Sequence, residues 1–423
     1  MGSSPQIADA AGRKCLARIR VFRATERPPP SHSANSWQGL VGHDDSRVDI
    51  AVVGSGPCGL YAARELSRSF PGFRIVVIES GPVVSAAVDR YPDVRWHSSM
   101  ASLKLGSPID VAVPDHYAPT SHELAKYLQS FAKQAGLHVV TDTALTNMEK
   151  SVADEEKGWI LSLTTPSGES GAVFAPIVVL ATGIYGNPRP FEPPGQTDRI
   201  HRYLDIGVKG ENIVLVGGGT SAADAITHLL PHNRISWVVR DEKPHKVWIG
   251  VRPSFEAVMA QYGDNLKLFT QTEVAEIQSS TVLLSSGESI SDVDQVLGLI
   301  GFEPASPLFE KIGIEMFRGG IVLSERFETT LPGVFAFGSV ANGWDDAAGK
   351  VAASFVENGH RQRFPSLRDG ICARLVTGMY GELTSSQPWV SDDRSNSQPE
   401  EKIVRPGRIR LFIYRLWRML SHR

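Results

Sequence analysis

Cysteine is scarce in this chain of 423 residues. Only Cys15, Cys58 and Cys372 occur, and an odd number at such wide spacing supports neither a disulfide framework nor a zinc site. No metal centre is therefore predicted. The cysteine usage fits a reducing compartment, so we expect a cytoplasmic protein. Because the N-terminal segment is basic, targeting to an organelle stays open as an alternative.

Long apolar runs are also missing. No stretch has the length and apolarity of a membrane-spanning helix, and the first 30 residues lack the continuous apolar core of a secretory signal. The 43 basic and 46 acidic residues nearly balance, which gives no global electrostatic reason to expect a nucleic-acid partner. We expect a soluble globular protein of two or three domains.

A first glycine-rich turn lies between two predicted strands, Val48–Val53 and Arg74–Glu79, and a helix follows the turn. Glycines at this spacing let the chain turn tightly, approach a pyrophosphate and pack the helix against the strand. Glu79 follows at a place where its carboxylate can accept a hydrogen bond from a ribose hydroxyl. The predicted dinucleotide-binding residues are Gly54, Gly56, Pro57, Cys58, Gly59 and Glu79.

The same βαβ pattern returns over residues 212–240. Its turn has the looser form found in nicotinamide-binding domains, with Ala222 in the place of the third glycine. Arg240 ends the next strand, where NAD enzymes tend to have an acidic residue and NADP enzymes a base that meets the 2'-phosphate. This favours NADPH, and the alternative is a solvent-facing arginine. The predicted binding residues are Gly217, Gly219, Thr220, Ser221, Ala222 and Arg240.

Together with Ala181–Gly183 and Gly333–Gly338, these two loops resemble the thioredoxin-reductase-like flavoproteins over Val48 to Gly370. The resemblance implies an α/β fold with two Rossmann-like dinucleotide-binding domains, the NAD(P) domain being inserted in the FAD domain. It implies FAD in the first site and NADPH in the second. It also adds Trp96, Thr182, Gly183, Gly338 and Ser339 as cofactor-binding residues. The family usually has aspartate where this chain has Ser339, so the contact with the ribityl chain should differ.

Within this group, the Gly-Pro-Cys-Gly turn and the segments Arg90–Pro92 and Glu357–Gly359 resemble the bacillithiol disulfide reductase-like branch. That branch implies reduction of small disulfides without a Cys-x-x-Cys pair. A cysteine at a helix N-terminus gains thiolate character, so Cys58 is a candidate redox residue. The alternative is a small residue that only fills the turn. His97 is a candidate proton donor, or else a buried residue without a catalytic role.

The rival class is a flavin-dependent monooxygenase of the N-hydroxylating or Baeyer-Villiger type. His201 and Tyr203 loosely resemble the flavin-containing monooxygenase fingerprint, but the Phe-x-Gly that precedes the histidine in that signature is absent. A third hypothesis, outside catalysis, is a flavoprotein scaffold that binds a partner through its C-terminal tail.

The pattern also predicts the organisation of the chain. A basic, disordered extension covers residues 1–47, and the FAD-binding domain comprises 48–190 and 302–383 around an NAD(P)H-binding domain at 191–301. Residues 384–423 form a polar linker and a basic amphipathic tail, which could contact a membrane surface or a protein, or pack on the chain itself. A homodimer is a further hypothesis. A capping residue followed by helix formers predicts that a helix begins near Asp345.

Overall fold

The computed structural model describes residues 40–41, 46–96, 100, 105, 117–151, 157–244, 252–303, 306–317, 320–341, 344–345, 350–351 and 359–380. The chain divides into two compact units, Met1–Pro388 and Trp389–Arg423, and every described residue belongs to the first. The predicted N-terminal extension before residue 40, His97 and the predicted C-terminal tail therefore lie outside the described residues.

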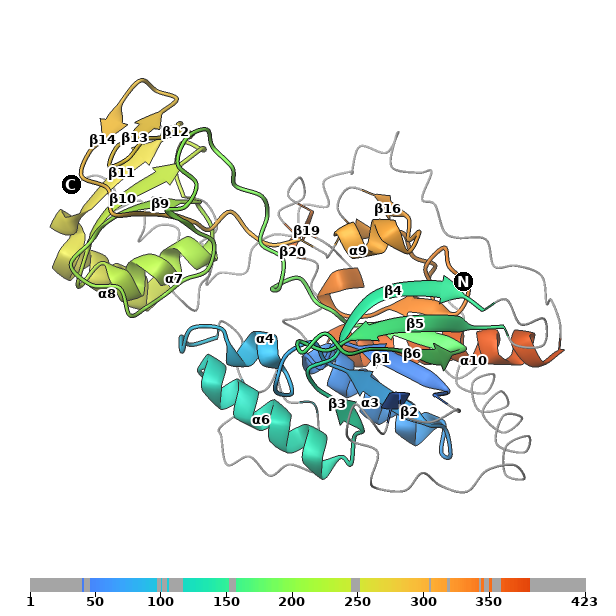
Figure 1. Ribbon diagram of the computed structural model, residues 1–423. Helices are drawn as coiled ribbons and strands as arrows, with labels where there is room; N and C mark the ends of the chain where they lie inside the picture. Colours follow the sequence, from blue (N-terminus) through green and yellow to red (C-terminus); the bar gives the residue numbers. More distant parts are fainter. Residues whose placement is uncertain are drawn as a thin grey trace, which may run out of the picture. The chain divides into compact units, whose positions relative to one another are not determined.

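A five-stranded parallel sheet of order β18-β7-β1-β2-β3 carries the first glycine loop (Figure 1). The strands are short and almost fully buried, as expected for a parallel sheet that is covered on both faces. Their bounds are β1 Ile50–Val53, β2 Ile75–Ile78, β3 Val139–Val140, β7 Ile177–Leu180 and β18 Val334–Ala336. Strands that are distant in the sequence thus lie side by side.

Alternate residues of these strands enter two separate cores. Ile50 and Val52 pack with α3 (Pro57–Ser69), α6 (Ser121–Gln134) and α10 (Gly359–Tyr380). Ala51 and Val53 pack on the other face with the antiparallel sheet β4-β5-β6 and with α9 (Ser306–Lys311). The bounds of that sheet are β4 Ala144–Lys150, β5 Trp159–Thr164 and β6 Ser170–Ala175. The two-residue period of a strand therefore accounts for the layered arrangement.

A second five-stranded parallel sheet has the order β11-β10-β9-β15-β8. Its bounds are β8 Ile200–His201, β9 Asn212–Val216, β10 Arg234–Val239, β11 Leu266–Thr270 and β15 Gln295–Gly298. One core of this sheet includes residues of α7 (Thr220–Leu229), and side chains of α8 (Arg252–Tyr262) pack against it. The other core includes β12 (Val274–Ile277) and β13 (Val282–Leu284), which pair with β14 (Ser289–Ile290). The prediction of an α/β fold with two Rossmann-like units is confirmed.

The two segments that connect the sheets pair with each other. Pro188 forms an antiparallel bridge with Phe302, the Arg189 amide donates to the Gly301 carbonyl at 3.0 Å, and the Glu303 amide donates to the Asn187 carbonyl at 2.9 Å. This pairing ties the two connecting segments to each other.

The helix predicted to begin near Asp345 is wrong. Asp345 lies in β19 (Trp344–Asp345), which pairs antiparallel with β20 (Lys350–Val351), with Asp345 opposite Lys350. A helix that began at Asp345 would run through Lys350, which lies in a strand instead. Capping and propensity are weak local preferences, and strand pairing has overridden them here.

Two searches of the described residues gave negative results. None of the helices there is both long and apolar enough to cross a membrane. The same residues contain no group of three or more histidine, cysteine, aspartate or glutamate side chains that could hold a metal ion.

Candidate functional site

The first glycine loop follows the carboxyl end of β1, and each of its glycines has a different surrounding. Gly54 has φ +103°, and a β-carbon there would lie 2.5 Å from the Ala181 carbonyl oxygen. A β-carbon at Gly59 would overlap the Gly54 carbonyl oxygen. At Gly56, by contrast, a β-carbon would meet nothing within 4 Å. Two glycines are thus required by packing inside the protein, and the third borders open space.

Helix α3 begins directly after this open space. Gly56 is its N-cap residue and Pro57 its first helical residue, and its first turn contains no acidic side chain. The first amides of a helix have no partner within the helix and present partial positive charge. The loop can therefore receive a pyrophosphate against bare backbone, with the positive end of α3 facing it.

Glu79 lies just past the carboxyl end of β2 and is 7% exposed. Its Oε2 atom accepts hydrogen bonds from the Ser55 amide at 3.1 Å and the Ser55 hydroxyl at 2.5 Å, and its Oε1 atom accepts one from the Gly81 amide at 2.8 Å. The carboxylate that was predicted to bind the ribose is thus held against the glycine loop by its own chain. Oε1 keeps acceptor capacity for one further donor.

Three sequence-distant segments meet at this edge of the sheet. Gly338 follows β18 with φ +89°, and a β-carbon there would lie 2.8 Å from Cβ and 3.0 Å from Sγ of Cys58 on α3. Gly183 follows β7, and a β-carbon there would lie 3.6 Å from Oγ of Ser339. The structure therefore brings Cys58, Gly183, Gly338 and Ser339 into one neighbourhood. It also leaves the buried Thr182 hydroxyl with no hydrogen-bond partner among the described residues.

An aromatic cluster of Tyr91, Trp96 and Tyr185 lines a small pocket together with Asp224. The ring centroids are 6.4 Å apart for Tyr91 and Trp96, and 6.1 Å apart for each ring with Tyr185. The indole N–H of Trp96 donates to Ser121 Oγ at 3.1 Å, which fixes the ring. Trp96 was predicted to stack on a cofactor, and the structure places it in this aromatic wall.

Tyr91 connects the aromatic cluster with the second glycine loop. Burial raises the pKa of the Tyr91 hydroxyl, and the nearby Tyr185 and Asp224 raise it further, whereas a hydrogen bond with Ser221 lowers it. Ser221 belongs to the first turn of α7 and was predicted to bind the nicotinamide cofactor. Tyr91 remains a neutral hydrogen-bonding group throughout the physiological pH range.

The second glycine loop repeats the arrangement of the first. Gly217 has φ +129°, and a β-carbon there would overlap the Leu299 carbonyl oxygen, while one at Gly219 would meet nothing within 4 Å. Gly219 is the N-cap residue of α7, and Thr220 is its first helical residue. The third position holds Ala222, which is fully buried in the core beneath α7. Alanine is therefore small enough for this helix to pack on its sheet.

Arg240 lies at the carboxyl end of β10, as the NADPH prediction requires. Its side chain is 78% exposed, and its Nη1 atom lies 4.0 Å from Oε1 of Glu273, which is 63% exposed. An exposed ion pair at this distance contributes little to stability, about 0–1 kcal/mol. The guanidinium can accordingly turn toward a 2'-phosphate at small cost.

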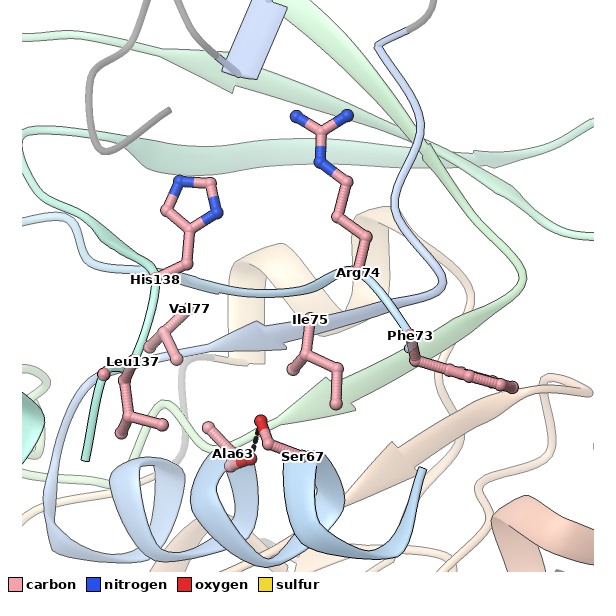
Figure 2. A pocket seen from close by; sticks show the side chains of 9 residues that line it. Ala63, Ser67, Phe73, Arg74, Ile75, Val77, Leu137 and His138 are labelled. Atoms are coloured by element: carbon pink, nitrogen blue, oxygen red, sulfur yellow. Dashed lines mark hydrogen bonds between the residues drawn. The ribbon is translucent and has the colours of Figure 1, made fainter. Parts of the chain in front are cut away.

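A separate cavity of about 170 Å³ lies at the other end of the first sheet, between α3 and the residues that precede β2 and β3. Figure 2 shows Ile75 and Leu137 pointing toward α3, and Arg74 and His138 pointing away from it. The Ser67 hydroxyl that faces this cavity already donates to the Ala63 carbonyl at 2.9 Å. The cavity is thus remote from the glycine loops and is not part of the cofactor site.

These observations fit the two cofactors that the sequence implies. The open space at Gly56, the positive end of α3 and the Thr182 hydroxyl, which has no hydrogen-bond partner within the described part of the chain, suit a flavin dinucleotide in the first site. The open space at Gly219 and the exposed Arg240 suit NADPH in the second. Sequence reasoning missed Ser55 and Ser85 as supports of Glu79. A serine before two alanines resembles an ordinary helix cap and gives no signal of such a role.

Comparison with known proteins agrees with this reading. Residues 51–338 match the family described as pyridine nucleotide-disulphide oxidoreductase. The chain is similar to bacilliredoxin reductase Bdr of Bacillus subtilis (strain 168), with 26% identity over 323 residues, which cover 73% of this chain and 93% of that protein. A ferredoxin–NADP reductase of Nocardioides sp. is 26% identical over 307 residues, covering 69% of this chain and 84% of that protein.

A solved structure shares the fold. The bacillithiol disulfide reductase Bdr (YpdA) from Bacillus cereus matches with a TM-score of 0.68 and 22% sequence identity, covering 78% of this chain and 99% of that one. The resemblance to flavoprotein reductases that the sequence predicted is thereby confirmed.

Proposed function

Because the chain belongs to the pyridine nucleotide-disulphide oxidoreductase family, we propose that it uses electrons from NADPH to reduce a low-molecular-weight disulfide. It is an FAD- and NADPH-dependent oxidoreductase, and the small-molecule acceptor is what we propose. The identity of the electron acceptor is the subject of the proposal. One named relative is a bacilliredoxin reductase and a similar solved structure is a bacillithiol disulfide reductase, which supports an acceptor of this class.

The observation that carries the proposal is the position of Cys58. Its sulfur lies against Gly338, in the segment that returns to the first sheet, and a side chain at Gly338 would overlap it. The thiol is therefore in the part of the site where Gly183 and Ser339 also meet, rather than only beneath the pyrophosphate loop. Cys58 also occupies the first turn of α3, whose positive end favours a thiolate.

FAD held by the first glycine loop, Glu79 and Thr182 would supply the two electrons that originate in NADPH. The Cys58 thiolate attacks one sulfur of the disulfide, so that a mixed disulfide forms, the original S–S bond breaks, and the first thiol leaves with a proton from solvent. The two electrons then cleave the mixed disulfide, which releases the second thiol with another proton and restores the Cys58 thiolate. One NADPH, one disulfide and one proton thus give NADP⁺ and two thiols.

The test is anaerobic reduction of the purified protein with NADPH, followed by reoxidation in separate experiments with bacillithiol disulfide, cystine, glutathione disulfide, oxygen or an iron–sulfur protein. The proposal expects rapid reoxidation by at least one disulfide and a loss of at least 100-fold in that rate for Cys58→Ala. Flavin reduction by NADPH should be unchanged in the variant, because Cys58 acts after that step.

Cys372 provides the matched control. It is a second buried cysteine, 2% exposed, that lies on α10 in the same core as Cys58 but belongs to neither glycine loop. Cys372→Ala should therefore retain disulfide reduction. Disulfide turnover that survives in Cys58→Ala would overturn the role of this thiol. A long-lived oxygenated flavin spectrum would indicate a monooxygenase instead, and rapid reoxidation only by an iron–sulfur protein would indicate a ferredoxin reductase.

A further inference from the structure

Two serines hold the first glycine loop and Glu79 together. In addition to the two bonds from Ser55 to Glu79, the Ser85 amide donates to Ser55 Oγ at 2.7 Å, and the Ser85 hydroxyl donates to the Ser55 carbonyl oxygen at 2.5 Å. Ser55 is 0% and Ser85 1% exposed. Ser55 therefore contributes its amide, its carbonyl and its hydroxyl to a buried network that joins residues 24 and 30 positions apart.

The direction of each bond in this network follows from the groups themselves. A backbone amide only donates, so Ser55 Oγ must accept from Ser85. The hydroxyl hydrogen of Ser55 is then directed to the Glu79 carboxylate, and the Ser85 hydroxyl must donate, because a carbonyl oxygen only accepts. No choice of hydrogen placement enters, in contrast to most hydroxyl networks.

Ser85 adopts an unfavourable conformation in order to make these bonds. It precedes α4 (Ala86–Asp89) as its N-cap residue with φ 58° and ψ 40°, in the left-handed region, and its side chain makes no capping bond. An N-cap serine ordinarily has an extended backbone and uses its hydroxyl to cap the helix. A non-glycine residue in the left-handed region persists only where surrounding contacts enforce it. Here the amide and the hydroxyl of Ser85 both bond to Ser55, while its carbonyl oxygen accepts from the Val88 and Asp89 amides of α4.

The network leaves the two oxygens of Glu79 in different states. Oε2 accepts two hydrogen bonds from Ser55 and is filled. Oε1 accepts from the Gly81 amide, and Ser80 Oγ lies at the limiting distance of 3.5 Å. We propose that Ser55 and Ser85 are positioning residues that hold Oε2, so that Oε1 is the atom that receives a ribose hydroxyl of FAD. This role is independent of the electron acceptor.

The central test is a double-mutant cycle on FAD affinity. FAD is titrated into protein from which the flavin has been removed, and the dissociation constant is read from quenching of flavin fluorescence. Ser55→Ala should weaken FAD binding about tenfold, the size of one hydrogen bond to a charged group at its lower limit. In the Glu79→Ala background the same substitution should change the constant by less than about twofold, because no carboxylate remains to be positioned.

Ser85→Gly tests the second residue without adding backbone strain. Glycine adopts the left-handed conformation freely and keeps the amide bond to Ser55 Oγ, so only the bond to the Ser55 carbonyl is lost. We expect weakening of FAD binding by about two- to fivefold, without a fall in the melting temperature of the flavin-free protein. Ser67→Ala is the control. It removes the hydrogen bond from the Ser67 hydroxyl to the Ala63 carbonyl, which lies on α3 beside the remote cavity of Figure 2.

The outcomes separate positioning from general support of the fold. An equal loss of affinity for Ser55→Ala in the presence and absence of Glu79 would overturn the proposal, as would wild-type affinity in both serine variants. If Glu79→Ala does not fold, Glu79→Gln serves in the same cycle, because its side chain keeps the shape but lacks the second acceptor oxygen. In that case non-additivity still supports positioning, and strict additivity refutes it.

Discussion

The glycines of the first loop allow a sharp separation of binding from folding. Gly56 has φ −65°, which alanine adopts, and among the described residues beyond its chain neighbours a methyl group there would meet no atom within 4 Å. Gly56→Ala should therefore fold, with a loss of about 0.5–1 kcal/mol because alanine is a poor N-cap residue. Gly59→Ala, in contrast, would overlap a backbone oxygen of the same loop, and overpacking of this kind costs typically 1–3 kcal/mol or more.

Gly56→Ala should weaken FAD binding strongly, although it lowers the stability of the protein only slightly. The methyl group of Gly56→Ala would occupy the space through which a pyrophosphate reaches the backbone amides. Loss of one hydrogen bond to a charged group, about 1.5–3 kcal/mol, corresponds to roughly 10- to 150-fold weaker FAD binding. The melting temperature of the flavin-free protein and the FAD dissociation constant, measured side by side, test both statements.

Gly263→Ala is the matched control for this pair. Gly263 begins the 3₁₀ turn Gly263–Asn265 after α8, and a β-carbon there also meets nothing within 4 Å. Its substitution should change neither the melting temperature nor FAD affinity appreciably. Wild-type FAD affinity in Gly56→Ala would refute the reasoning, because the open space beside Gly56 would then not be where the cofactor approaches.

Three further predictions concern the second sheet. Gly219→Ala should raise the dissociation constant for NADPH about 10- to 150-fold while the bound FAD content stays unchanged, as titration and visible absorbance would show. Arg240→Ala should reduce the preference for NADPH over NADH, in kcat/KM, by about 10- to 100-fold, and Glu273→Gln should raise it slightly, since Glu273 competes for the guanidinium; an unchanged ratio in Arg240→Ala contradicts the NADPH assignment. Burial lowers the pKa of His228 below its usual 6.5, so the unfolded chain binds a proton more readily. The free energy of unfolding should accordingly rise with pH up to about 6.5, and His228→Gln should flatten that slope in denaturant titrations, whereas an unchanged slope would argue against it.

The strands and glycine loops could be predicted from the sequence because their signals are local. The buried runs before Gly54 and Gly217 and the glycine spacing each require only a few neighbouring residues, and the structure places them as expected. Glu79 could be placed for the same reason, since its distance from the loop is set by one helix and one strand.

What the sequence did not reveal depends on contacts between distant segments. Ser85 looks like a helix cap, and only its bonds to Ser55 turn it into the left-handed conformation. The aromatic wall requires Tyr91 and Tyr185 to meet, although nearly a hundred residues separate them in the chain. The helix predicted at Asp345 was wrong for a related reason, because strand pairing with Lys350 overrides a favourable local helix signal. Local preference is informative where no distant partner competes with it.

The strand order of the first sheet has a consequence for synthesis on the ribosome. β7 is made early, but its outer neighbour β18 follows only after about 150 further residues. At about 5–20 residues per second, this edge stays without its partner for roughly 8–30 seconds while the whole second sheet emerges. The apolar strand Ile177–Leu180 is during that interval an open edge, of the kind that pairs with foreign chains. The nascent chain is therefore most vulnerable to aggregation after its first cofactor loop exists and before its first sheet is complete.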